Sequence, residues 1–97
     1  MDKTTHLTIL YDYYSELLTD NQRLYFEEYY FQNLSLGEIS DNYKISRNAV
    51  HKNIKTVEDK LTEYEDKLNL YKKSLIIDKI ISEISDKKIK AELEEIK

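Results

Sequence analysis

Residues 34–55 decide the fold of this chain, and their sequence is Leu34-Ser-Leu-Gly-Glu-Ile-Ser-Asp-Asn-Tyr-Lys-Ile-Ser-Arg-Asn-Ala-Val-His-Lys-Asn-Ile-Lys55. Ser35 stands three residues before Glu38, the spacing at which the two side chains cap a helix start reciprocally. After a short turn at residues 44–45, Ser46 is a second capping residue and begins another helix. The stretch therefore predicts two helices, the first spanning residues 36–42, joined by a tight turn as in a helix-turn-helix motif.

The second helix of this motif is predicted to have a basic outer face. Ala49, Val50 and Ile54 are the apolar residues of its inner side. In a helix-turn-helix, the second helix presents its N-terminal residues to the major groove of DNA. The candidate nucleic-acid contacts are therefore Arg47, Asn48, His51, Lys52 and Lys55. Helix pairs with this turn also occur as plain packing units, and this second interpretation stays open.

The composition favours a small, all-α protein. The chain has 97 residues, one glycine, no proline and no cysteine. Few helix-breaking residues favour helix nearly throughout, and the lack of cysteine excludes disulfides and thiolate metal sites. The N-terminus has no apolar run typical of a signal peptide, and no stretch approaches the roughly 18 apolar residues of a membrane span. We expect a soluble, cytoplasmic protein without membrane insertion.

The distribution of charge matters more than the formal net charge of −4. Residues 1–45 contain three cations and eight carboxylates, a net charge of −5. Residues 46–55 contain three cations and no carboxylate, a net charge of +3. A short basic segment can contact phosphate but supplies few of the contacts that drive affinity. Strong, sequence-independent DNA binding by a single protomer is therefore not expected.

Two further helices are predicted before the motif, at residues 5–18 and from about residue 21 to 32. The second has a mostly aromatic face: Leu24, Tyr25, Phe26, Tyr29, Tyr30 and Phe31. A tyrosine can bury its ring while its hydroxyl stays hydrated, and the neighbouring Glu27 and Glu28 would repel phosphate. We therefore predict that this face belongs to the core and is not a stacking platform for bases.

After Ser46 no helix breaker occurs until about residue 73, which predicts a helix longer than 25 residues. Its apolar residues alternate at spacings of four and three, a heptad pattern: Val50, Ile54, Val57, Leu61, Tyr64, Leu68, Tyr71 and Leu75. Residues 75–84 then add a wide aliphatic stripe: Leu75, Ile76, Ile77, Ile80, Ile81 and Ile84. A cap at Ser85-Asp86 precedes a charged C-terminal helix with Ile89, Leu93 and Ile96 on one side.

One neighbouring helix cannot cover this much apolar surface, so we expect a homodimer formed through residues 57–84. The candidate interface residues are Leu61, Tyr64, Leu68, Tyr71, Leu75, Ile77, Ile80, Ile81 and Ile84. Burial of the whole stripe within one chain is the alternative.

No pattern in the chain indicates catalysis. His6 and His51 lie far apart in the sequence, and the adjacent carboxylates Glu27-Glu28, Glu65-Asp66 and Glu94-Glu95 do not face a common point on a helix. The sequence contains neither a glycine-rich phosphate loop nor a nucleophile elbow. We expect no catalytic residue, no metal site and no cofactor.

Residues 19–55 resemble region four of bacterial sigma factors, which binds the promoter −35 element. The matching residues are Thr19, Gln22-Arg23, Leu34-Ser35, Glu38-Ile39, Ile45-Ser46, Val50 and Ile54. Over residues 1 to about 75 the chain resembles the YlxM family more specifically. The motifs of that resemblance are Leu10-Tyr11-Asp-Tyr-Tyr, Leu18-Thr19, Tyr29-Tyr30, Ser35-Leu-Gly-Glu-Ile39, Ser46-Arg-Asn-Ala-Val50 and Asn53-Ile-Lys55.

The resemblance implies a small all-helical protein of Gram-positive bacteria and mycoplasmas whose gene neighbours that of the signal recognition particle GTPase. It further implies a regulatory role in that targeting pathway, with DNA binding inferred from the fold. The expected architecture is a helix-turn-helix head at residues 1–56 and a dimerising extension at residues 57–97, within a single domain. The leading function is regulation through DNA or RNA. The alternative is an adaptor of the particle or its receptor that uses the helix-turn-helix only as scaffold.

Overall fold

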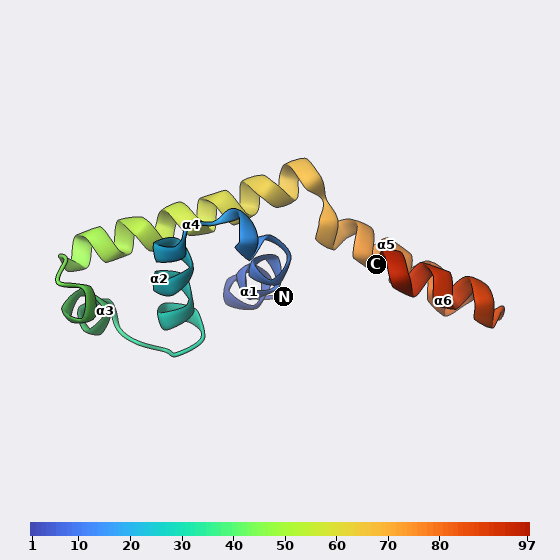
Figure 1. The fold of residues 1–97 in the computed structure, drawn as a ribbon, viewed down its shortest axis with the longest axis horizontal. Coiled ribbons are helices and arrows are strands. Elements are labelled where there is room, and N and C mark those ends of the chain that lie inside the picture. The colour runs from blue at the N-terminus through green and yellow to red at the C-terminus, as the bar shows by residue number, and fades with distance from the viewer.

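The computed structural model describes all residues 1–97, and every regular element in it is a helix. In chain order these are α1 (Lys3–Tyr14), a 3-10 turn (Ser15–Leu17), α2 (Asp20–Tyr30), α3 (Leu36–Tyr43), α4 (Arg47–Leu68), α5 (Leu70–Glu83) and α6 (Lys87–Ile96). The molecule measures 55 × 24 × 23 Å. In Figure 1, α1, α2 and α3 lie along one side of α4, and α5 and α6 extend away as a hairpin. The predicted all-α fold is confirmed.

Capping residues set the helix starts of the head. Thr19 caps α2 and Ser35 caps α3, each by a reciprocal capping box with the residue three positions later. Ser46 Oγ accepts a hydrogen bond of 3.0 Å from the backbone N–H of Ala49 at the start of α4. Between α3 and α4, Lys44 adopts left-handed backbone angles, φ 54° and ψ 43°. Local capping chemistry thus sets both ends of the helix-turn-helix turn.

Helix α4 organises the core of the head. Its C-terminal half packs with α1 and α2 in one apolar cluster: Leu7, Leu10, Tyr11, Tyr14, Leu18, Phe26, Val57 and Leu61. Its N-terminal half packs with α2 and α3 in a second cluster: Tyr25, Ile39, Val50 and Ile54. The predicted heptad positions of α4 are therefore buried within the chain as far as Leu61. The aromatic face of α2 is core only in part, because Leu24, Tyr29 and Phe31 remain exposed.

Two expectations about the long helix are wrong. It ends at Leu68 after 22 residues, because Asn69 takes left-handed angles, φ 56° and ψ 30°. Leu61 has no exposed surface, and the ring of Tyr64 lies 5.9 Å from that of Tyr14. Leu61 therefore cannot contact a second chain. Val57 and Leu61 belong to the core of the head, and the tail is counted below from Asn69, where α4 has ended.

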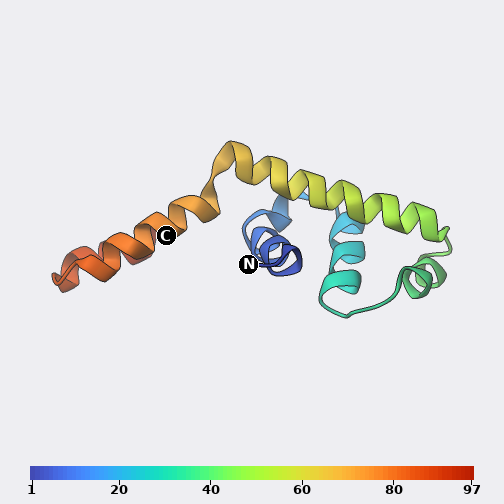
Figure 2. The same cartoon turned by 180° about the vertical axis from the view of Figure 1, so that it is seen from behind.

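The tail, defined here as residues 69–97, has almost no interior. Ser74 is its only buried residue. Leu75 and Ile76 are each 50% exposed, and Ile77, Ile81 and Ile84 are half-buried. Viewed from behind in Figure 2, the α5–α6 hairpin extends clear of the helices of the head. The aliphatic stripe that the sequence predicts is therefore only partly covered within one chain.

Candidate nucleic-acid interface

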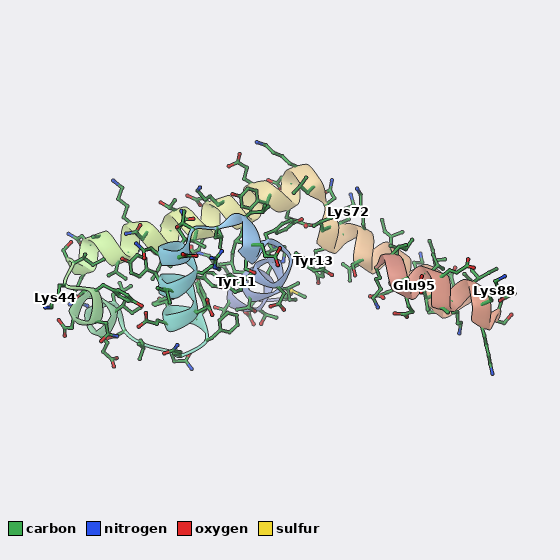
Figure 3. The ribbon with its side chains drawn as sticks, viewed as in Figure 1. Tyr11, Tyr13, Lys44, Lys72, Lys88 and Glu95 are labelled. Carbon is green, nitrogen blue, oxygen red and sulfur yellow. The ribbon has the colours of Figure 1, made fainter.

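The start of α4 lies at the end of the molecule opposite the tail, next to α3 (Figures 1 and 2). Ile39 from α3 and Val50 and Ile54 from α4 are buried together and fix the two helices against each other. The remaining side of α4 is left to solvent. Figure 3 labels Lys44 at this end of the molecule, in the turn between the two helices.

The five predicted contact residues form what we call the basic face: Arg47, Asn48, His51, Lys52 and Lys55, all of them exposed. Lys55 Nζ lies 3.3 Å from Asp59 Oδ1, one turn further along α4, in an exposed ion pair. The Nε atom of Arg47 lies close to Gly37 at the start of α3. Neither Arg47 nor Lys52 makes an ion pair, so both cations are available to an incoming phosphate.

A groove of about 420 Å³ lies beside the basic face. His51 and Lys55 form part of its wall, whereas Arg47, Asn48 and Lys52 lie outside it. The other lining residues come from α1, α2, α3 and the inner side of α4: Lys3, Tyr29, Tyr30, Leu36, Ile54 and Glu58.

Lys3 is a further cation at this site, and the sequence pattern does not indicate it. Its Nζ lies 3.2 Å from Glu58 Oε1, and the hydroxyl of Tyr30 also donates a hydrogen bond to the Glu58 carboxylate. Packing of α1 against α4 thus brings Lys3 to the same groove as His51 and Lys55. No local pattern around Lys3 could have indicated this, because the contact spans more than fifty residues of chain.

The two glutamates of α2 are bound to tyrosines. The hydroxyl of Tyr11 donates to Glu27 at 2.7 Å. The buried Glu28 accepts hydrogen bonds from the hydroxyl of Tyr43 and, at 3.0 Å, from the side-chain amide of Asn42. The hydrogen bond to Glu28 and burial raise the pKa of Tyr43 to about 12. These carboxylates contribute to the packing between helices, and none of them forms an ion pair with the basic face.

The remaining features of the chain add no further binding chemistry to this site. The structure contains no group of three or more histidine, cysteine, aspartate or glutamate residues that could hold a metal ion. The ring centroid of His6 lies 6.1 Å from that of Tyr71 at the start of α5. None of the helices combines the length and the apolar character needed to cross a membrane.

Comparison with known proteins identifies the family. All of residues 1–97 match the model of the UPF0122 family, described as "Putative helix-turn-helix protein, YlxM / p13 like". A UPF0122 protein of Oceanobacillus iheyensis is 53% identical to this chain, over 75% of this chain and 70% of its own. One from Listeria welshimeri is 38% identical over 99% of this chain and 96% of its own. The chain therefore belongs to the UPF0122 family of YlxM/p13-like proteins, and the resemblance to YlxM is confirmed.

Proposed function

We propose that this protein is a non-enzymatic regulator that binds nucleic acid with the basic face of α4. The observation that carries the proposal is the position of that face. Five polar or cationic side chains are exposed on the first turns of the second helix of a helix-turn-helix, in a segment without a carboxylate from residue 44 to 57. This is the part of such a motif that enters the major groove in DNA complexes.

The five residues divide into two roles. Arg47, Asn48 and His51 lie nearest the N-terminus of α4, where a helix in the groove approaches base edges, so they are the candidates for base contacts. Lys52 and Lys55 lie further along the helix and are the candidates for phosphate contacts. Lys3 lies beside Lys55 at the groove and adds a cation to the second group.

We further propose that the protein acts in the signal recognition particle pathway, with DNA or RNA as the ligand of the basic face. This placement is supported by membership of the YlxM-like family and by what resemblance to that family implies. An adaptor role toward the particle or its receptor is the second candidate. The uncovered apolar side chains of the tail favour it, because an exposed patch of this kind marks an interaction surface.

We also propose that the chain forms a homodimer through its tail. Leu61 is excluded by its burial, and Tyr64 is half-buried within the head. The remaining predicted interface residues keep surface for a partner: Leu68, Tyr71, Leu75, Ile77, Ile80, Ile81 and Ile84. A single two-helix hairpin leaves much of this apolar stripe exposed. Covering the stripe with a second apolar surface stabilises the tail.

Nucleic-acid binding is tested with two double variants of equal charge change. K52A/K55A removes two cations from the basic face, whereas K72A/K73A removes two exposed cations from the start of α5. Binding to a pool of genomic fragments and to the RNA of the particle is measured against salt concentration. We expect K52A/K55A to weaken binding to all sequences and to lower the salt slope by about 2, and K72A/K73A to bind like the parent.

A third variant tests base contacts. Asn48→Ala removes a side chain that can bond to a base edge without changing charge, so it should alter the preference among sequences. The proposal is refuted if the parent protein binds neither pool, or if K52A/K55A and Asn48→Ala both bind like the parent. The adaptor role then becomes the better explanation of the exposed surface.

A further inference from the structure

Helix α6 carries its charges in two blocks of opposite sign. The first half has three lysines and the second half three glutamates: Lys87, Lys88, Lys90, Glu92, Glu94 and Glu95. This order opposes the helix macrodipole, which favours acidic residues at the N-terminus and basic residues at the C-terminus. Of the six side chains only Glu94 forms an ion pair, at 3.5 Å from Lys97. Contacts within one chain therefore do not explain the pattern.

The two blocks are complementary when one of them is reversed. Counting outward from Ala91, a lysine on one side matches a glutamate on the other at 90 and 92, at 88 and 94, and at 87 and 95. Positions 89 and 93 are isoleucine and leucine. A second copy of α6 lying antiparallel presents this reversed order and places each lysine block against a glutamate block. A parallel copy would place like charges together, which is unfavourable.

We propose that the tail binds the tail of a second copy of this chain, with the two α6 helices antiparallel and a two-fold axis near Ala91. The inference rests on the proposed homodimer and specifies its geometry. A two-fold contact uses the same surface on both copies, so every complementary pair occurs twice. One self-complementary segment is therefore sufficient to define the interface.

Exposed apolar side chains of the hairpin supply the surface to be buried. Lys97 Nζ lies 2.6 Å from Asp78 Oδ1 and occupies one side of the hairpin. Ile76 and Ile80 are each two residues from Asp78, about 200° around a helix, and so lie on the opposite side of α5. They are 50% and 41% exposed, and Ile89 on α6 is 45% exposed. Covering these side chains with a second hairpin gives the tail the core that it lacks alone.

Lys88 and Glu95 are the residues with which to test this geometry. They are two helical turns apart on one face of α6, and Figure 3 shows Lys88 near the tip of the tail and Glu95 nearer the head. With the axis near Ala91, Lys88 lies one residue along the helix, about 1.5 Å, from the level of the partner's Glu95, so the two side chains come close on the shared face, and the same contact occurs a second time by symmetry. Reversing either charge alone converts two attractive contacts into two repulsive ones.

The first experiment measures the dimer dissociation constant by sedimentation equilibrium for K88E, E95K and the double variant K88E/E95K. Each single variant should dissociate roughly tenfold more readily than the parent, and the double variant should return close to the parent value. K72E makes the same charge change outside α6 and should leave the constant unchanged. Circular dichroism checks that every variant keeps its helix content.

The second experiment measures the relative orientation of the two α6 helices by disulfide formation. The chain has no cysteine of its own, so only the introduced cysteines can form a disulfide. K88C and E95C are oxidised separately and as a mixture. Antiparallel pairing predicts a cross-linked dimer chiefly in the mixture, whereas parallel pairing would cross-link each variant alone.

The geometry is overturned if the single charge reversals dimerise like the parent, if the double variant fails to recover, or if K88C and E95C cross-link alone. A parent chain that stays monomeric at high concentration overturns the geometry and the homodimer together. None of these measurements involves nucleic acid, so they test the dimer geometry independently of the function proposed for the basic face.

Discussion

Replacing Glu65 by alanine should loosen the junction at which the tail leaves the head. The Glu65 carboxylate accepts hydrogen bonds from the hydroxyl of Tyr14 at 2.6 Å and from the backbone N–H groups of Tyr71 and Lys72 at 3.1 Å. The hydroxyl of Tyr14 in turn accepts a hydrogen bond of 3.0 Å from the N–H of Leu70. Glu65 of α4 thus caps α5 by accepting hydrogen bonds from two backbone N–H groups of its first turn. Tyr14 of α1 accepts the third, from Leu70.

The expected cost follows from these bonds. Asn69 precedes α5 without making a side-chain cap, so the loss of Glu65 leaves the first turn of α5 uncapped. Loss of a helix cap costs about 1 kcal/mol, and loss of a hydrogen bond from a buried hydroxyl to a charged acceptor costs about 1.5–3 kcal/mol. Because Glu65 is only half-buried, we expect the lower part of the combined range, about 2.5–3 kcal/mol of unfolding free energy, for Glu65→Ala.

The stabilisation that the Glu65 carboxylate provides should depend on pH. Burial alone would raise the pKa of Glu65, but the hydrogen bonds from Tyr14, Tyr71 and Lys72 outweigh it and hold that pKa below its ordinary value of 4.5. A carboxyl whose pKa is lowered by folding stabilises the folded state above its unfolded pKa. That contribution is lost as the pH falls through the folded pKa. The difference in stability between the parent and Glu65→Gln should therefore be largest near neutral pH and shrink below pH 4.5.

Urea unfolding measures the global cost, and amide hydrogen exchange of Leu70, Tyr71 and Lys72 measures the local one. Glu63→Gln is the matched control, because Glu63 lies on the same helix but is exposed and paired only with Lys67, at 2.7 Å. It should change neither readout appreciably. Equal effects of Glu63→Gln and Glu65→Gln, or unchanged exchange in the first turn of α5 of Glu65→Ala, would refute the capping role.

Two further predictions concern the backbone and the tyrosines. Lys44→Gly should stabilise the protein by about 1 kcal/mol, because glycine adopts the left-handed angles of the turn without strain; thermal unfolding measures this, and a lower melting temperature would contradict it. Four tyrosines that donate to carboxylates have raised pKa values, about 12 for Tyr14 and for Tyr43: Tyr11, Tyr14, Tyr30 and Tyr43. Their stabilising contribution is complete below pH 10 and is lost as the pH rises through the raised pKa of each tyrosine. Tyrosinate absorbance should therefore increase in two phases, and a single phase near pH 10 would show that these hydroxyls are free.

Local chemistry made the head predictable. The serine-to-glutamate spacing at residues 35 and 38 and the serine at 46 indicate helix starts, and the structure has both caps. Lys44 has left-handed backbone angles, for which glycine is the usual residue. Apolar periodicity identified Val50 and Ile54 as core residues of α4. These features depend on neighbours within a few residues, so sequence alone is sufficient to find them.

The end of α4 was not predictable from the heptad pattern, which continues through the junction to Leu75. Asn69 interrupts the helix because asparagine tolerates left-handed angles, a weaker signal than glycine or proline. The start of α5 is capped by Glu65 and Tyr14, which are far apart in sequence. Apolar spacing shows which residues are buried, but it does not show whether their partner is the same chain or another.

The candidate site was predictable only where it lies on one helix. The basic face follows from the spacing of five residues on α4, whereas the contribution of Lys3 depends on tertiary packing of α1. The role of Glu27 and Glu28 on α2 also depends on tertiary packing and could not be predicted from the sequence. Their number suggested a surface that repels nucleic acid, but the structure shows Glu27 and Glu28 bound to tyrosine hydroxyls. Counting charges along a sequence does not show which carboxylates are hydrogen-bonded to side chains of the core.

The positions of the basic face and of α6 constrain how a dimer could work. They lie at opposite ends of a molecule 55 Å long (Figure 1). If two chains join by antiparallel α6 helices, the two basic faces end up further apart than the length of one protomer. Dimeric helix-turn-helix proteins that bind palindromic sites hold their recognition helices about 34 Å apart, one turn of DNA. A tail-to-tail dimer would therefore not span two adjacent half-sites on a straight duplex. Each head would bind its own segment of nucleic acid, and the dimer would connect the two segments.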